Sequence, residues 1–237
     1  MATAASPGRS ICTTCCAPGW CKRRRFGIRR RPAGVGFTAQ AGHRPGCRTR
    51  RAEPDSGRRA TNVVTEDVRA RASRIRLLIF DVDGVLTDGS LYLGDNRREY
   101  KAFHSRDGHG MKMLQASGVE IAVITGRESG VVRHRMADLG VQHVFQGQLD
   151  KVAAYESLLG QLHLHSEQTA YVGDDVVDLA VMRRAGLAVA VRDAHPVVAA
   201  QAHWVTASDG GRGAAREVCE LIMDAQGTLA AQLARFL

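Results

Sequence analysis

From Ile75 to the C-terminus, short apolar runs alternate with longer segments in which apolar residues recur every three or four positions. A short apolar run predicts a buried strand, and the longer period predicts an amphipathic helix. The predicted strands are Ile75–Val82, Val119–Ile124, Val141–Phe145, Thr169–Val172 and Ala188–Val191, with a short edge strand at His203–Val205. The predicted helices are Gly108–Ala116, Ser129–Leu139, Lys151–Leu162, Val176–Ala185, Val197–Ala202 and Gly213–Ala225. This alternation is typical of an α/β fold with a Rossmann-like parallel sheet and helices on both faces.

Residues 91–103 carry a different pattern. Leu91–Leu93 and Glu99–Phe103 are short alternating runs, and the turn-forming residues Gly94–Asn96 lie between them. This arrangement predicts a β-hairpin flap. Because a two-stranded hairpin is marginally stable alone, we expect other protein surface to protect it.

Polar residues follow three of the predicted strands at the point where each strand ends. Asp81 and Asp83 close the first, Thr125-Gly126-Arg127 closes the second, and Gly173-Asp174-Asp175-x-x-Asp178 closes the fourth. Each group alone also fits a structural role, as a turn or a helix N-cap. Because parallel strands end on one edge of a sheet, the three groups together predict a shared site if their strands are neighbours.

The Asp81-Val82-Asp83-Gly84 segment indicates the chemistry of that site. Two carboxylates one residue apart repel each other, so the site needs a cation, a shared proton or both. Mg²⁺ fits this need, because it prefers oxygen ligands and often binds through one or two carboxylates plus a substrate phosphate. The alternative is a surface turn, since Asp and Gly are common turn residues.

Charge divides the chain into two parts. The whole sequence has a formal net charge of +9, but residues 1–74 hold 17 Lys and Arg against 4 Asp and Glu. The remainder holds 16 against 20, so the basic character belongs to the N-terminal segment. We predict a disordered basic extension over residues 1–70, because this composition buries too little apolar surface to fold. Residues 71–237 then form one domain of ordinary size.

The origin of the basic extension stays open. It resembles an organelle transit peptide, upstream sequence translated from an early start codon, or a basic arm that binds nucleic acid. Cysteines 12, 15, 16, 21 and 47 lie there without a second pair at zinc-site spacing, whereas Cys219 is expected in the core. No apolar run approaches the about 20 residues of a membrane span, so no membrane association is expected.

The motifs resemble those of the haloacid dehalogenase-like phosphatases, whose four motifs occur in this order. The resemblance runs from about Arg74 to Leu237. The supporting stretches are Phe80–Gly89, Arg106–Gly110, Ile124–Arg127, Gly173–Asp178, Asp193–Pro196 and Gly210–Glu217. The last three stretches, with the absence of an inserted cap domain, make the chain most similar to the subfamily acting on 3-deoxy-D-manno-octulosonate 8-phosphate.

The resemblance implies how the aspartates share the reaction. Asp81 would be the nucleophile that forms an aspartyl-phosphate, and Asp83 would be the general acid and then the general base. Mg²⁺ would be held by Asp81, the Asp83 carbonyl and Asp174. Asp175 and Asp178 would lie in or near its coordination shell.

The resemblance also implies a set of substrate-binding residues. Thr125, Gly126 and Lys151 would bind the phosphoryl group. Lys151 could instead be a solvated lysine, but the helix dipole disfavours a lysine at a helix start, which favours the functional role. A planar guanidinium suits the substrate carboxylate, or else forms a surface ion pair. The candidates are Arg127, Arg106 and Arg212, in that order.

As a whole, the resemblance implies a cytoplasmic Mg²⁺-dependent sugar-phosphate phosphatase of lipopolysaccharide biosynthesis. Relatives of this kind form homotetramers in which a neighbouring subunit closes the capless site, and Gly210–Gly213 with the C-terminal tail would be a mobile lid. One alternative keeps the chemistry but takes a nonulosonate 9-phosphate as substrate. Another is nucleic-acid binding by the Arg-rich arm, against which the intact motifs and the lack of interleaved aromatic residues argue.

Overall fold

The computed structural model describes residues 64–96 and 98–237. The predictions for the basic extension and its five cysteines therefore lie almost wholly outside the described residues. Cys219 is buried, as expected for a core residue. No helix in the described ranges is long and apolar enough to cross a membrane.

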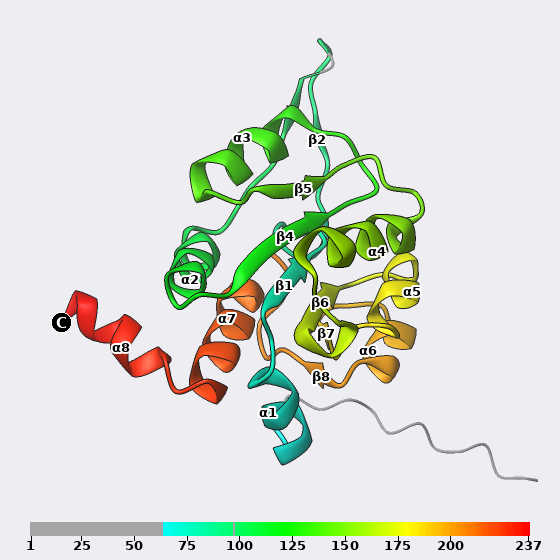
Figure 1. Ribbon diagram of the computed structural model, residues 1–237. Coiled ribbons are helices and arrows are strands. Elements are labelled where there is room, and N and C mark those ends of the chain that lie inside the picture. Colours follow the sequence, from blue (N-terminus) through cyan, green and yellow to red (C-terminus); the bar gives the residue numbers. More distant parts are fainter. Residues whose placement is uncertain (1–63, 97) are drawn as a thin grey trace, which may run out of the picture. The chain divides into compact units, whose positions relative to one another are not determined.

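A six-stranded parallel sheet forms the centre of the folded part, with strand order β5-β4-β1-β6-β7-β8 (Figure 1). This confirms the predicted parallel sheet and the edge position of the last strand. Strand β1 is central, between β4 and β6. The strands are β1 (Leu77–Phe80), β4 (Glu120–Ile124), β5 (His143–Phe145), β6 (Thr169–Gly173), β7 (Leu187–Ala190) and β8 (Trp204–Val205).

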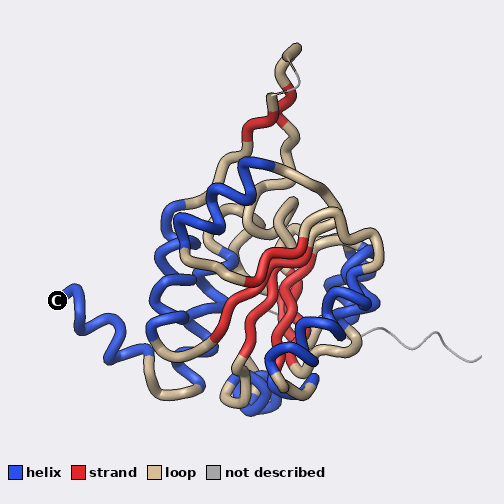
Figure 2. Tube along the Cα trace, turned by 45° about the horizontal axis from the view of Figure 1, so that its top comes forward, coloured by secondary structure: helices blue, strands red, loops and turns tan. Residues whose placement is uncertain are grey.

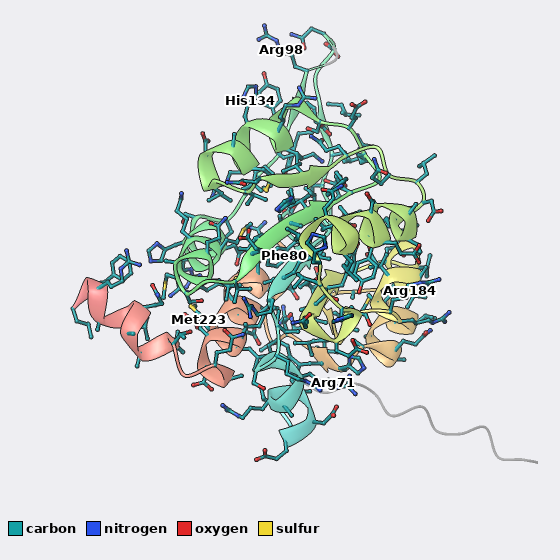
Figure 3. The ribbon with its side chains drawn as sticks, in the orientation of Figure 1. Arg71, Phe80, Arg98, His134, Arg184 and Met223 are labelled. Carbon is teal, nitrogen blue, oxygen red and sulfur yellow. The ribbon has the colours of Figure 1, made fainter. Side chains whose placement is uncertain are left out.

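Helices cover both faces of this sheet (Figures 1 and 2). Alternation along β1 sends Leu78 and Phe80 to one face and Leu77 and Ile79 to the other, and all four are fully buried. Phe80 lies at the centre of the molecule in Figure 3. The first face packs against α1 (Glu66–Ala72), α2 (Ser105–Ala116), α3 (Gly130–Leu139) and α7 (Ala214–Ala225). The second packs against α4 (Lys151–Leu162), α5 (Leu179–Met182) and α6 (Pro196–Gln201).

The predicted hairpin is also present. Strands β2 (Tyr92–Leu93) and β3 (Glu99–Tyr100) pair antiparallel and form a separate two-stranded sheet. Figure 2 shows this hairpin projecting beyond the main sheet, and Arg98 marks its outer end in Figure 3. Its apolar side chains Leu91, Tyr92, Leu93 and Tyr100 are all exposed in the single chain.

Helix α1 shows that the ordered part begins before residue 71. The Thr65 hydroxyl caps the helix, and Val68 and Ala72 are buried against the core. The boundary predicted between residues 70 and 71 therefore falls inside an ordered helix. The boundary was placed too late because α1 has only two buried apolar residues, Val68 and Ala72. Two such residues are too few to show a helical period in the sequence.

Two further segments differ from the prediction. The single helix expected at Val176–Ala185 is a 3₁₀ turn, Val176–Asp178, followed by the one-turn α5. The turn forms because Asp175 caps it and Asp178 points into the protein, where it is fully buried. The C-terminal tail, for which no element was predicted, holds α8 (Leu229–Leu233) and a last 3₁₀ turn.

The glycine-rich loop before α7, which was expected to form a mobile lid with the C-terminal tail, packs against the turn that follows β1. Gly211 N donates to the Val85 carbonyl at 2.8 Å, and Gly210 N donates to Asp193 Oδ1 at 2.9 Å. A Cβ on Gly210 would collide with the Gly84 carbonyl oxygen. These glycines permit close backbone packing, which fixes the loop against the turn that follows β1.

Candidate active site

The carboxyl ends of β4, β1 and β6 bring the three predicted polar groups together. Asp81 follows β1, Thr125 follows β4 and Asp174 follows β6, so adjacent strands deliver all three to one edge of the sheet. One pocket opens there. It is lined by Asp81, Asp83, Thr125, Gly126, Arg127, Gln148, Leu149, Lys151, Asp174, Asp175 and Val177. The predicted convergence is confirmed.

Asp81 is held firmly at the base of this pocket. Its side chain is nearly buried, and its Oδ1 accepts a 2.6 Å hydrogen bond from Val82 N. Its Oδ2 lies 2.8 Å from Lys151 Nζ. The backbone continues the β1–β6 ladder, since Asp81 N donates to the Val172 carbonyl at 3.0 Å. The sheet itself therefore positions this carboxylate.

Asp178 organises the pocket from below. Its Oδ1 accepts from Lys151 Nζ and from the Tyr171 hydroxyl, each at 2.7 Å. Its Oδ2 accepts from the backbone N–H groups of Asp174 and Asp175, at 3.1 and 3.3 Å. Four protein donors thus occupy the carboxylate of Asp178, which fixes the loop that carries Asp174.

The acidic groups Asp81, Asp174 and Asp178 place carboxylate oxygens within 4.8 Å of one another. Burial and the nearby Asp178 carboxylate raise the pKa of Asp81 to about 6, although Lys151 acts in the opposite direction. Burial together with Asp178 and Asp81 raises the pKa of Asp174 to about 8. Such a cluster favours an added positive charge.

The same residues fit a Mg²⁺ ion. Asp174 Oδ1 is buried without a hydrogen-bond partner among residues 64–96 and 98–237, which leaves an oxygen available as a ligand. Asp174 approaches the turn after β1 so closely that a Cβ on Gly84 would collide with Asp174 Oδ2. Gly84 has φ = +90°, a conformation that glycine adopts without strain. The donor set and the close approach suit the expected ligands Asp81, Asp83 carbonyl and Asp174.

Lys151 lies inside the site rather than on the surface. It is the first residue of α4, where Asp150 caps the helix, and its side chain is 4% exposed. Burial acts to lower the pKa of Lys151, but the Asp81 and Asp178 carboxylates outweigh it and raise the pKa. The solvated alternative is therefore contradicted. A buried ammonium at the pocket wall is available to a bound anion.

Thr125 and Gly126 form another wall of the pocket. Thr125 is buried, and its N–H donates to the Phe145 carbonyl of β5 at 2.9 Å. Its carbonyl accepts from Gln148 N at 3.0 Å, which closes the loop after β5 over the same pocket. Thr125 and Gly126 therefore both line the pocket in which the phosphoryl group was expected to bind.

The three candidate arginines are placed differently. Arg127 lines the pocket, with its Nε 3.6 Å from Asp83 Oδ2 and its Nη2 3.2 Å from Glu99 Oε1. Arg106 is exposed at the start of α2 and does not line the pocket of this chain. Arg212 pairs with Asp88 at 2.9 Å and also lies outside that lining. Of the three candidate arginines, Arg127 alone lines the pocket of this chain.

Two functional candidates were not identified from the sequence. Lys101 and Glu99 come from the hairpin, and Lys101 Nζ contacts Asp83 Oδ1 at the pocket. The period of two along a strand places residues 99 and 101 on the same side, which is a signal that could have grouped them. The contact between Lys101 and Asp83 was not predictable, because it depends on how the base of the hairpin lies against the turn that follows β1.

Comparison with known proteins identifies the family. Residues 140–218 match a model of the haloacid dehalogenase-like hydrolases. The chain is 52% identical over 166 residues to the 3-deoxy-D-manno-octulosonate 8-phosphate phosphatase of Escherichia coli, covering 70% of this chain and 88% of the relative.

Solved structures agree with this similarity. The corresponding phosphatase of Yersinia pestis is 51% identical with a TM-score of 0.69, over 70% of this chain and 89% of that one. The Moraxella catarrhalis phosphatase, solved with magnesium, phosphate and 3-deoxy-D-manno-octulosonate, is 40% identical with a TM-score of 0.70. That match covers 71% of this chain and 97% of the Moraxella chain. Together with the aspartate pocket at the ends of β1, β4 and β6, these similarities show that the chain belongs to the 3-deoxy-D-manno-octulosonate 8-phosphate phosphatase family of haloacid dehalogenase-like hydrolases.

Proposed function

We propose that this protein hydrolyses 3-deoxy-D-manno-octulosonate 8-phosphate to the free sugar acid and phosphate. The observation that carries the proposal is the pocket in which Asp81, Asp83, Thr125, Lys151 and Asp174 converge. Family membership supports the choice of substrate. The proposal includes a cytoplasmic reaction that supplies the sugar acid for lipopolysaccharide biosynthesis.

The first half of the reaction transfers the phosphoryl group to the protein. A carboxylate oxygen of Asp81 attacks phosphorus, the bond from phosphorus to the sugar oxygen breaks, and Asp83 donates a proton to that leaving oxygen. Lys151 Nζ, 2.8 Å from Asp81 Oδ2, lies where it can offset negative charge on the phosphoryl oxygens. The hydroxyl of Thr125, which also lines the pocket, supplies a further donor.

The second half regenerates the enzyme. Asp83, now ionised, takes a proton from water, and the resulting oxygen attacks phosphorus of the aspartyl-phosphate. The bond between phosphorus and the Asp81 oxygen breaks and releases phosphate. Asp178 keeps Lys151 and the Asp174 loop in place throughout, because its four hydrogen-bond donors all come from the protein.

Asp81, the Asp83 carbonyl and Asp174 would hold a Mg²⁺ ion, whose positive charge would reduce the repulsion between the anionic nucleophile and the anionic phosphate. Asp175 lines the same pocket and would lie near the ion. Asp178 serves the site through its protein hydrogen bonds, which leaves the ion to the other carboxylates.

Arg127 selects the sugar acid. Its guanidinium lines the pocket and pairs with Glu99, and its side chain is 47% exposed, so it remains open to a ligand carboxylate. Arg106 and Arg212 lie outside the pocket of the single chain, and they act on substrate only if a neighbouring subunit brings them to its site. A bidentate arginine–carboxylate pair gives the geometric specificity that separates this substrate from simple hexose phosphates.

We further propose a homotetramer in which the hairpin is covered. Leu91, Tyr92, Leu93 and Tyr100 are exposed in the single chain and lie on one small projecting element. An exposed apolar hairpin beside a capless pocket favours an interface with copies of the same chain, which would also enclose the pocket.

Phosphate release by the full chain with Mg²⁺ tests the function. We compare 3-deoxy-D-manno-octulosonate 8-phosphate with a nonulosonate 9-phosphate and with glucose 6-phosphate. A strong preference for the first substrate is expected. Preference for the nonulosonate ester would reassign the substrate while keeping the chemistry, and no release from any ester would overturn the proposal. The alternative of nucleic-acid binding concerns the basic extension, which the structure does not describe.

A further inference from the structure

Lys101 connects the hairpin to the pocket. It follows β3 directly, and its side chain is only 1% exposed. Its Nζ contacts Asp83 Oδ1 and lies 3.4 Å from Glu99 Oε1. The ammonium is therefore enclosed between two carboxylates, one from the turn after β1 and one from the hairpin.

The other oxygen of Asp83 faces a second cation. Asp83 Oδ2 lies 3.6 Å from Arg127 Nε, and Arg127 Nη2 in turn donates to Glu99 Oε1 at 3.2 Å. The four side chains form a closed ring of alternating charge: Asp83, Lys101, Glu99 and Arg127. Burial acts to raise the pKa of Glu99, but donors that include Arg127 and Lys101 outweigh it and lower the pKa.

This ring controls the orientation of Asp83. The carboxylate of Asp83 stands on a turn, not within a strand, and within the described part of the chain its charged partners are Lys101 and Arg127. Proton transfer requires the carboxylate to lie within hydrogen-bond distance of the leaving oxygen. A displacement of about 1 Å at a reacting group can reduce the rate by about a hundredfold.

Burying the ammonium group of Lys101 costs free energy, and side-chain packing alone does not explain why a lysine lies at this position. Removing an ammonium from water is unfavourable unless its partners compensate, and an apolar side chain of similar length would fill the same space. The charge is useful where a carboxylate needs a fixed orientation. Lys101 meets that need at Asp83.

We propose that Lys101 is a positioning residue for proton transfer, holding the Asp83 carboxylate toward the leaving oxygen of the substrate. This inference rests on the proposed function, because it assumes that Asp83 is the general acid. Glu99 fixes the other side of the ammonium and so couples the orientation of Asp83 to the hairpin. A purely structural Lys101 would support the hairpin without affecting proton transfer.

The leaving group separates these two roles. The alcohol of a sugar phosphate needs a proton as it departs. The phenol of phenyl phosphate depends less on protonation, and p-nitrophenol departs as a stable anion. The value of kcat/KM covers the steps through departure of the leaving group and excludes hydrolysis of the aspartyl-phosphate. We therefore measure kcat/KM of the full chain with Mg²⁺ for 3-deoxy-D-manno-octulosonate 8-phosphate, phenyl phosphate and p-nitrophenyl phosphate.

In the Lys101→Met protein, we expect the loss to be graded. The sugar phosphate should lose at least about tenfold more than p-nitrophenyl phosphate, and phenyl phosphate should fall between them. Lys112→Met, at an exposed lysine of α2, is the matched control and should leave all three values unchanged. A loss of equal size for the three substrates, or no loss, overturns the inference.

Lys101→Met leaves two carboxylates facing each other and can prevent folding, which a thermal unfolding scan detects. In that case Lys101→Arg decides, because it keeps the charge but displaces the donor groups. We expect a smaller loss of the same graded order, and a uniform loss or none overturns the inference. If the wild-type protein releases phosphate from none of the three esters, the proposed function itself fails.

Discussion

At the scale of the residue, Asp81 has a fixed geometry at the base of the pocket. Each of its oxygens has a strong partner, Val82 N at 2.6 Å and Lys151 Nζ at 2.8 Å. Asp81→Asn replaces an anionic nucleophile by a neutral amide, so we expect turnover to fall at least about a thousandfold. Phosphate release measures this loss.

The exposed Asp138→Asn on α3 is the matched control and should keep wild-type activity. Substantial turnover by the Asp81→Asn protein would place the nucleophile elsewhere in the pocket.

Most of these site residues could be predicted from the sequence, because they follow strands whose apolar pattern is visible. Asp81, Thr125 and Asp174 occupy the positions directly after β1, β4 and β6. Lys151 was also predicted, since a lysine at a helix start is disfavoured by the dipole. Lys101 was missed because its partner Asp83 is 18 residues away on another element, and no local pattern records that contact.

At the scale of the element, α7 depends on a residue from α2. The N-cap position of α7 is Gly213, which has no side chain to cap the helix. The buried Asp107 replaces it: Oδ1 accepts from Arg216 N at 2.9 Å and Oδ2 from Gly213 N at 3.2 Å. Asp107 therefore connects α2 to α7 while satisfying two orphan donors.

Asp107→Ala should lower the free energy of unfolding by about 1–3 kcal/mol, because it leaves buried N–H groups without an acceptor. Urea unfolding measures the change, with Asp138→Ala as the matched control. Asp107→Asn keeps one acceptor oxygen and should lose less. An unchanged urea midpoint for the Asp107→Ala protein would show that water accepts the hydrogen bonds that Asp107 otherwise accepts.

The elements themselves were largely predictable, and the exceptions have local causes. The hairpin and the helix Lys151–Leu162 appear as expected from alternation and period. Val176–Ala185 satisfied the helical period but is a 3₁₀ turn and one helical turn, since the buried Asp178 draws the backbone inward. The ion pair and hydrogen bonds of the buried Asp178 determine the local backbone there more strongly than the apolar pattern does.

At the scale of the whole molecule, the exposed hairpin predicts assembly. Leu93→Glu with Tyr100→Glu places two charges among its exposed apolar side chains. We expect a smaller particle by light scattering and a lower kcat/KM for the sugar phosphate, because an interface that encloses the pocket would be lost. Val197→Glu, at an exposed valine of α6, should change neither property. A wild-type particle size for the double variant would exclude the hairpin from the interface.

The sheet also predicts how the protein responds to Mg²⁺. The adjacent ends of β1 and β6 hold Asp81, Asp174 and Asp178 close together, and the repulsion among their carboxylates favours binding of a cation. At about a hundred times its dissociation constant, a ligand specific for the folded state contributes about 2.7 kcal/mol. For a domain of this size, that corresponds to a rise in Tm of about 5–10 °C.

Thermal scans in MgCl₂ and in NaCl of equal ionic strength separate binding from screening. Asp174→Asn, which removes the ligand oxygen that has no protein partner, should abolish the difference, whereas Asp138→Asn should keep it. Equal shifts in the two salts would mean that the aspartates are stabilised by protons and by Lys151, and not by a metal ion.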